Sequence, residues 1–87
     1  MAAPGWLLRD CIWALGEGWA VREVSWDDPE CPWLYHEDVV TVLVTDGIFQ
    51  TACVFSRPFL RIKDENHRGV MVRSMMEMAM KAVRDKH

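Results

Sequence analysis

The sequence VVTVLVT-DG-IFQTACVFS, residues 39–56, determines the expected fold. Two stretches rich in β-branched and aromatic residues, 39–45 and 48–56, flank Asp46-Gly47. An Asp-Gly pair supplies the positive φ angles that a two-residue type I′ turn requires. The sequence therefore predicts a β-hairpin at the centre of the fold.

The predicted turn sets the register of the hairpin and the face that points to the core. The pairs expected on the more apolar face are Val44 with Phe49, Val42 with Thr51, Val40 with Cys53 and Asp38 with Phe55. The opposite face is diluted by Thr41, Thr45 and Gln50. We expect the more apolar face to pack against helices.

A helix is predicted before the hairpin, from near Pro4 to about Leu15. Gly16 or Gly18 should end it, because glycine adopts the left-handed conformation that closes a helix. Its apolar face should comprise Leu7, Leu8, Cys11, Ile12 and Leu15. Trp6 and Trp13 fall on the opposite, polar face, where they need a cover.

A second helix is predicted after the hairpin, capped by Asp64 or Asn66 and ending at about Arg84. Its apolar arc contains Met71, Val72, Met75, Met76, Met78, Ala79, Ala82 and Val83. This arc is wider than a small sheet covers. Met71, Met78 and Met80, with Trp6 and Trp13, therefore form a predicted surface for a homodimer or for helix packing.

A strand at residues 19–26 and a Pro-containing loop at 27–32 complete the expected order. The fold class is α+β: a helix, a three-stranded antiparallel sheet with the Asp46-Gly47 hairpin, and a C-terminal helix. The strand at 19–26 alternates imperfectly, which favours a sheet edge or a bulge. A short fourth edge strand is considered at 59–63. Residues 1–87 are expected to form one small domain.

Length and composition restrict the function. A chain of 87 residues buries roughly 60–65% of its unfolded surface, which leaves little room for an enclosed substrate cavity. An enzyme is therefore disfavoured. The apolar runs are too short to span a bilayer and the N-terminus lacks a signal-peptide pattern, so we expect a cytoplasmic protein. Cys11, Cys31 and Cys53 are odd in number, which favours reduced thiols.

Catalytic and metal-binding motifs are lacking. Cys31 with His36 has no identifiable orienting group, and His36-Glu37-Asp38 alternates across a strand rather than converging on a metal. A loop cysteine and a surface histidine are the simpler interpretation. We expect no catalytic residues, no metal and no cofactor.

Charge and aromatic residues are unevenly distributed. Up to Asp46 the chain has nine carboxylates against Arg9 and Arg22, and from Gly47 onward four carboxylates against eight basic residues. Tryptophans interleaved with acids are typical of partner-binding surfaces. The predicted partner-binding residues are Trp26, Asp27, Asp28, Glu30, Trp33, Tyr35, Glu37 and Asp38. A merely solvated loop is the alternative.

These features favour a protein-binding module, with a basic protein surface as its partner. Small acidic chains without catalytic motifs are common among phage and mobile-element inhibitors, including anti-CRISPR proteins and DNA mimics, so an inhibitor is the more specific hypothesis. A structural subunit of a larger assembly is another alternative.

A basic segment supports a different alternative, nucleic-acid binding. Its candidate residues are Arg57, Arg61, Lys63 and Arg68. The order helix, three strands, helix is similar to that of double-stranded-RNA-binding domains over most of the chain. That resemblance implies phosphate contacts from a lysine cluster at the start of the last helix, where this sequence has Asp64-Glu65. The acids and the net charge of −3 oppose nucleic-acid affinity.

Overall fold

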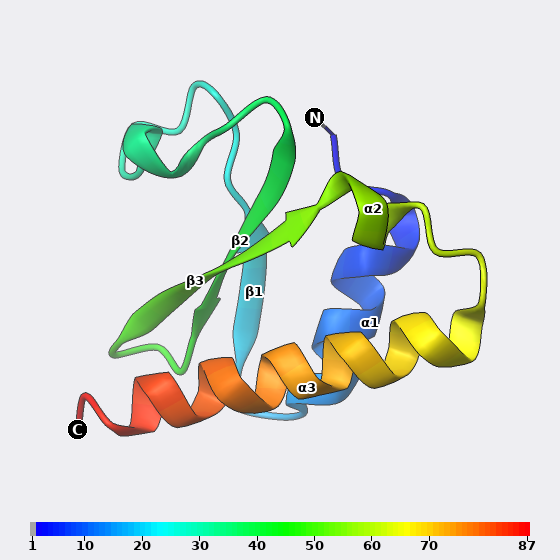
Figure 1. The fold of residues 1–87 in the computed structure, drawn as a ribbon. Coiled ribbons are helices and arrows are strands. Elements are labelled where there is room, and N and C mark those ends of the chain that lie inside the picture. The colour runs from blue at the N-terminus through cyan, green and yellow to red at the C-terminus, as the bar shows by residue number, and fades with distance from the viewer. Residues whose placement is uncertain (1) are drawn as a thin grey trace.

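The computed structural model describes residues 2–87 and has the predicted α+β architecture. Its elements in chain order are α1 (Gly5–Leu15), β1 (Ala20–Glu23), the 3-10 helix η1 (Pro32–Leu34), β2 (Val39–Thr45), β3 (Gln50–Ser56), α2 (Arg57–Leu60) and α3 (Glu65–Arg84). The strands form one antiparallel sheet in the order β1-β2-β3. Figure 1 shows α1 and α3 packed beside the sheet. The segment between β1 and β2 extends from the end of the sheet that lies away from α3 (Figure 1).

The hairpin is confirmed, but its predicted register is wrong by two residues. Thr45 pairs with Gln50, so residues 46–49 lie outside the ladder. The Asp46 carboxylate accepts hydrogen bonds from the amides of Ile48 and Phe49, both 2.9 Å long, and thereby stabilises the longer loop. A shift of two residues preserves the faces of a strand. The predicted core face is therefore correct.

The pairs on that face are Val44 with Thr51, Val42 with Cys53 and Val40 with Phe55. The three valines and Phe55 are buried. They form the main core with residues of the helices, namely Leu7, Cys11, Leu15, Phe59, Val72, Met76 and Ala79.

The predicted fourth edge strand at 59–63 is wrong. The chain turns directly from β3 into the short helix α2, with Pro58 in its first turn, where the missing N–H costs nothing. This turn buries Phe59 and places its ring 5.2 Å from that of Phe55. The first strand is also shorter than predicted, although it lies at the sheet edge as expected.

Helix α1 ends where expected, with the amide of Gly16 bonded to the carbonyl of Ile12 at 3.1 Å. Its buried residues are Leu7, Cys11 and Leu15, whereas Ile12 is exposed, contrary to the prediction. The contact with the sheet and α3 is thus narrower than the apolar face of the helix.

Helix α3 begins after Asp64, whose carboxylate accepts hydrogen bonds from the amides of Asn66 and His67. It buries Val72, Met76, Ala79 and Val83. Figure 1 shows the helix running along the molecule to the tip of the hairpin. None of the helices formed by residues 2–87 is long and apolar enough to cross a bilayer.

The other face of the sheet carries a second, smaller core. Leu43 of β2 packs there with Val24 and Cys31, and Leu34 and Tyr35 are partly buried against them. All of these except Leu43 belong to residues 24–38, here called the β1–β2 loop. The helices therefore cover one face of the sheet, and the loop covers the other face around Leu43, which explains why β2 is buried on both faces. Ala52 and Val54 of β3 stay exposed on the loop side of the sheet.

Candidate protein-binding site

The β1–β2 loop is fixed to the sheet by the buried carboxylate of Asp28. Its Oδ1 accepts hydrogen bonds from the amides of Glu30, at 3.0 Å, and Cys31, at 3.2 Å. Its Oδ2 accepts from the guanidinium of Arg22 on β1. The Arg22 hydrogen bond, helped by the two amides, holds the pKa of Asp28 below its ordinary value despite burial. The carboxylate therefore stays charged and joins the loop to β1.

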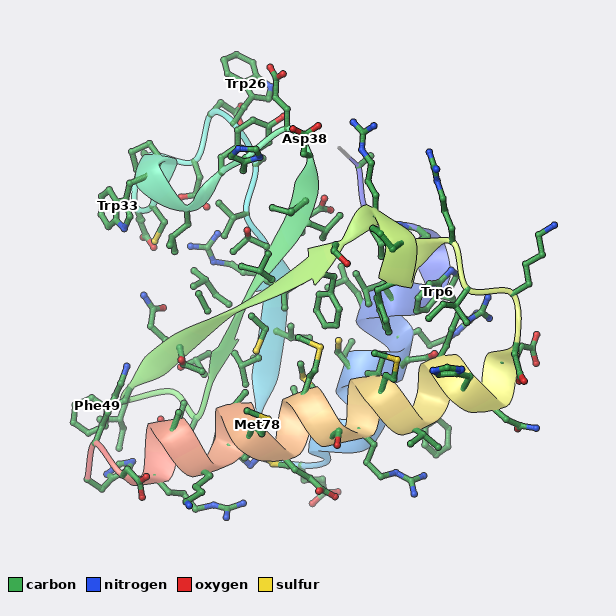
Figure 2. The ribbon with its side chains drawn as sticks, viewed as in Figure 1. Trp6, Trp26, Trp33, Asp38, Phe49 and Met78 are labelled. Carbon is green, nitrogen blue, oxygen red and sulfur yellow. The ribbon has the colours of Figure 1, made fainter. Side chains whose placement is uncertain are left out.

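The loop presents two tryptophans to solvent. Trp26 is 74% exposed and Trp33 is 75% exposed, although Val24, Asp28 and Cys31 of the same loop are buried. Figure 2 shows their side chains projecting from different parts of the loop, away from the sheet. Large apolar side chains held outward on an anchored segment are typical of binding surfaces rather than of a core.

The predicted acidic residues are in different environments. Asp28 is only 7% exposed, so its side chain stabilises the loop and is not available to contact a partner as predicted. Asp38 forms an ion pair with Arg57 at 3.0 Å, and Glu30 lies 3.4 Å from Arg22. Asp27 accepts a hydrogen bond from the hydroxyl of Ser25 at 2.7 Å. These three carboxylates are exposed, as is Glu37, and they belong to the same loop as the two tryptophans.

Tyr35, also predicted as a contact, is half-buried and packs against the smaller core. Its exposed part lines a pocket of about 280 Å³ at the end of β1. The residues around this pocket are Ala2, Glu23, Val24, Ser25, Trp26 and Tyr35. The structure thus brings Trp26 and Tyr35 together at one pocket, whereas Trp33 does not line it.

The predicted dimer surface is divided by the fold. Met71 and Met80 are partly buried against the main core of their own chain. Trp6 is half-buried, with its ring centroid 6.0 Å from that of Phe59. Trp13, 83% exposed, and Met78 remain on the surface. The wide methionine arc is therefore largely covered within one chain.

The predicted nucleic-acid residues are also divided. The Arg68 guanidinium lies over the Trp6 ring, 4.3 Å from its centroid, and donates a hydrogen bond to the carbonyl of Ile62. Arg57 is paired with Asp38. Arg61 and Lys63 are exposed on the segment between α2 and α3. Two of the four basic residues are thus engaged within the chain.

A groove of about 580 Å³ lies between α1 and α3. Trp6, Arg9, Trp13, Arg68, Arg73 and Met80 contribute to its lining. Asp10, Glu65 and Glu77 also line it, so its charges are mixed. Neither a strongly basic nor a strongly acidic ligand is favoured by this arrangement.

Two residues of the candidate site escaped the sequence analysis, Arg22 and Glu23. Both lie in β1, where neighbouring arginine and glutamate residues are typical of a partly exposed strand and indicate no particular site. The Asp-Asp-Pro sequence after Trp26 signalled a turn, but only the tertiary structure shows which carboxylate is buried. Among the described residues, no group of three or more potential ligand side chains is arranged to hold a metal ion.

Comparison with known proteins adds no relative, since no family model, curated protein or solved structure matches the chain.

Proposed function

We propose that the protein is a non-enzymatic protein-binding module whose β1–β2 loop contacts a partner with a basic surface. The observation that carries the proposal is the exposure of Trp26 and Trp33 on a loop anchored through buried Asp28. Tryptophans in interfaces contribute strongly to affinity when a partner buries them. An anchored loop loses less conformational entropy on binding than a mobile one, which further favours association.

The exposed acids on the same loop as the tryptophans support the choice of a basic partner. Asp27, Glu30, Glu37 and Asp38 are exposed. Exposed charges at the rim of an interface accelerate encounter with an oppositely charged surface. An inhibitor that covers a basic, nucleic-acid-binding surface, as phage and mobile-element inhibitors do, is the more specific form of the proposal. We place it in the cytoplasm, in keeping with three free cysteines.

Affinity capture with matched variants tests the proposal. The wild-type protein, Trp33→Ala and Ile48→Ala are immobilised, and proteins retained from an extract of the native host are quantified by mass spectrometry. Ile48 is the control because it is similarly exposed but lies between β2 and β3. We expect at least one basic protein to be retained by the wild type and Ile48→Ala and lost with Trp33→Ala.

The retained protein is then purified for kinetic measurements. Asp27→Asn with Glu30→Gln should lower the association rate and flatten its salt dependence, with a smaller effect on dissociation. Equal retention by all three immobilised proteins, or a partner that is insensitive to the loop charges and to Trp33, would refute the proposal.

The nucleic-acid alternative draws on the observed α-β-β-β-α order, which is similar to that of double-stranded-RNA-binding domains. Arg61 and Lys63 are its exposed basic residues. Electrophoretic mobility with duplex RNA and DNA at low and moderate salt distinguishes the two functions. Tight, salt-sensitive binding that is lost in Arg61→Ala with Lys63→Ala would favour the alternative.

Self-association is a separate proposal that draws on exposed Trp13 and Met78. We propose a homodimer in which a second copy covers these residues. Light scattering over a range of concentrations measures the oligomeric state directly. A dimer that dissociates in Trp13→Ala supports this surface, and a strict monomer at high concentration contradicts it.

A further inference from the structure

The pocket at the end of β1 combines two aromatic side chains with a carboxylate. Trp26 and Tyr35 contribute the aromatic side chains, and Glu23, the last residue of β1, contributes the carboxylate. Aromatic faces attract cations through their quadrupole, and a nearby carboxylate adds direct charge attraction. We propose that this pocket binds the side chain of an arginine from a basic peptide segment. The inference rests on the proposed function, because it names the group of the partner that the loop recognises.

The size of the pocket fits one side chain. Its volume is about 280 Å³, below the roughly 300–1,000 Å³ of pockets that enclose drug-sized ligands. The walls are formed by the N-terminal segment at Ala2, by β1, by the start of the loop and by Tyr35. Among the lining residues, Trp26 is exposed and Glu23 is half-buried.

Glu23 is held in position by the N-terminal segment. Its Oε1 accepts a hydrogen bond from the amide of Ala3 at 2.9 Å, and its side chain is half-buried. A carboxylate has two oxygens and about four acceptor sites, so this bond leaves capacity for a guanidinium. The pocket thus offers a preformed acceptor rather than a mobile surface acid.

Arginine fits better than lysine for a geometric reason. A planar guanidinium stacks on an indole while its N–H groups, which lie in the same plane, reach a carboxylate at the side. The chain contains this kind of stacking already, since the guanidinium of Arg68 lies 4.3 Å from the centroid of Trp6. An ammonium is more strongly hydrated and lacks the planar contact.

Charge around the pocket favours the same ligand. Asp27 and Glu30 are exposed on the loop that follows Trp26, and Asp38 is exposed at the far end of the loop. A basic peptide with several arginines could place one in the pocket while others face these acids. Arg22 is paired with Asp28 and Glu30, and Arg57 is paired with Asp38, but neither arginine lines the pocket.

The test uses short acetylated peptides that are identical except for one central residue: arginine, lysine or citrulline. Citrulline keeps the shape of arginine and removes its charge. Binding to the full-length ¹⁵N-labelled protein is followed by NMR. We expect the arginine peptide to produce saturable shifts at the Trp26 indole and at the amides of Ser25 and Glu23, with little change at the Trp33 indole.

Variants locate the interaction. Glu23→Gln preserves an acceptor for the Ala3 amide and removes the charge, and Trp26→Ala removes the exposed indole; each should weaken binding by about tenfold. Ile48→Ala is the matched control, because Ile48 is as exposed as Trp26 but lies outside both the pocket and the β1–β2 loop. It should bind the arginine peptide like the wild type. Dispersed amide spectra of each variant establish that it is folded.

Three outcomes would overturn the inference: equal binding of the citrulline peptide, unchanged binding by Glu23→Gln, or equal shifts at Trp26 and Trp33. Tighter binding of the lysine peptide would overturn the assignment to arginine. The outcome is separable from that of the proposed function. A captured protein partner that needs Trp33 but tolerates Trp26→Ala would refute the pocket and retain the function, whereas peptide binding without any captured partner would do the reverse.

Discussion

The guanidinium of Arg22 on β1 is hydrogen-bonded to the buried carboxylate of Asp28 in the β1–β2 loop. Arg22 and Asp28 are six positions apart in sequence, and the contact closes the first part of the loop against the sheet edge. Because Asp28 also accepts hydrogen bonds from the amides of Glu30 and Cys31, one side chain sets both the position and the local conformation of the loop. We therefore expect the placement of the two exposed tryptophans to depend on Asp28.

Replacement of Asp28 should therefore loosen the loop. Asp28→Ala removes three hydrogen-bond acceptor contacts at once and leaves the Glu30 and Cys31 amides without their partner, so we expect a melting temperature lower by several degrees. Asp27→Ala is the matched control, because the neighbouring carboxylate is exposed and should have little effect. Circular dichroism melts measure both. Equal melting temperatures would show that Asp28 does not anchor the loop.

Trp33→Ala should leave the stability nearly unchanged, within about 0.5 kcal/mol, because the exposed indole contributes little to a core. Leu43→Ala, beneath the same loop, should cost roughly 2–5 kcal/mol through loss of buried contacts. Chemical denaturation provides both free energies of unfolding. A loss at Trp33 as large as that at Leu43 would assign the indole to the core and contradict its role as an anchor.

The carboxylate of Asp46, in the loop between β2 and β3, should make the stability of the folded protein sensitive to acid. A hydrogen bond from His87, and then those from the Phe49 and Ile48 amides, lower the pKa of Asp46 to about 2. Its unfolded value is about 3.9. A lowered folded pKa adds stability that is present above the unfolded value and is lost as pH falls through the folded value. The melting-temperature difference between wild type and Asp46→Asn should therefore shrink as the pH falls from ~4 to ~2.

Asn at position 46 can still accept the two amide hydrogen bonds, so this comparison isolates the charge. Asp28, whose pKa is also lowered, is present in both proteins and does not affect the difference. A melting-temperature difference that stays constant down to pH ~2 would mean that the charge of Asp46 does not stabilise the folded protein.

Two glycines should respond in opposite directions to alanine. Gly47 has φ +97°, with open space where a Cβ would lie, so Gly47→Ala should cost about 1–3 kcal/mol from backbone strain alone. Gly69 lies inside α3, also in open space, and Gly69→Ala should stabilise the protein by about 0.5–1 kcal/mol. Thermal unfolding of the two variants provides the comparison, and a shift of the same sign in both would contradict the turn conformation.

The phase of α3 predicts a contrast between its two faces. Met76 is fully buried, so Met76→Asp should cost several kcal/mol by placing a carboxylate in the core. Lys81 is exposed, and Lys81→Ala should cost only a few tenths of a kcal/mol. Urea denaturation distinguishes these effects. Similar losses in both variants would be incompatible with the observed burial of the helix.

Local patterns predicted the main elements because their signals lie within a few residues. The Asp46-Gly47 pair located the hairpin, and Asp64 located the start of α3. The register was wrong because Ile48 and Phe49 resemble strand residues, yet the Asp46 carboxylate binds their amides and holds them in the loop. Pattern alone does not reveal such a side-chain contact. The helical turn α2 had a usable signal in Pro58 after Ser56, which favours a helix start.

The exposure of the two tryptophans could be predicted from the sequence, whereas the environments of the neighbouring acids could not. Trp26 and Trp33 are exposed, as an anchor hypothesis requires. The acids next to them could not be sorted from sequence, because the burial of Asp28 depends on Arg22 in a neighbouring strand and the pairing of Asp38 depends on Arg57, nineteen residues away. Likewise, no local pattern places Glu23 beside Tyr35. Each of these relationships is created by the packing of the loop on the sheet.

The two cores on opposite faces of the sheet have a consequence for motion. The smaller core joins the loop to the sheet through Leu43, whereas the larger one joins both long helices to it. Opening of the loop therefore exposes fewer apolar contacts than unfolding of the whole chain and should occur more often. Amide hydrogen exchange at Cys31 and Leu34 should be faster than at Val42. Substitutions beneath the loop would then change the proposed binding surface, while the packing of the helices on the sheet is retained.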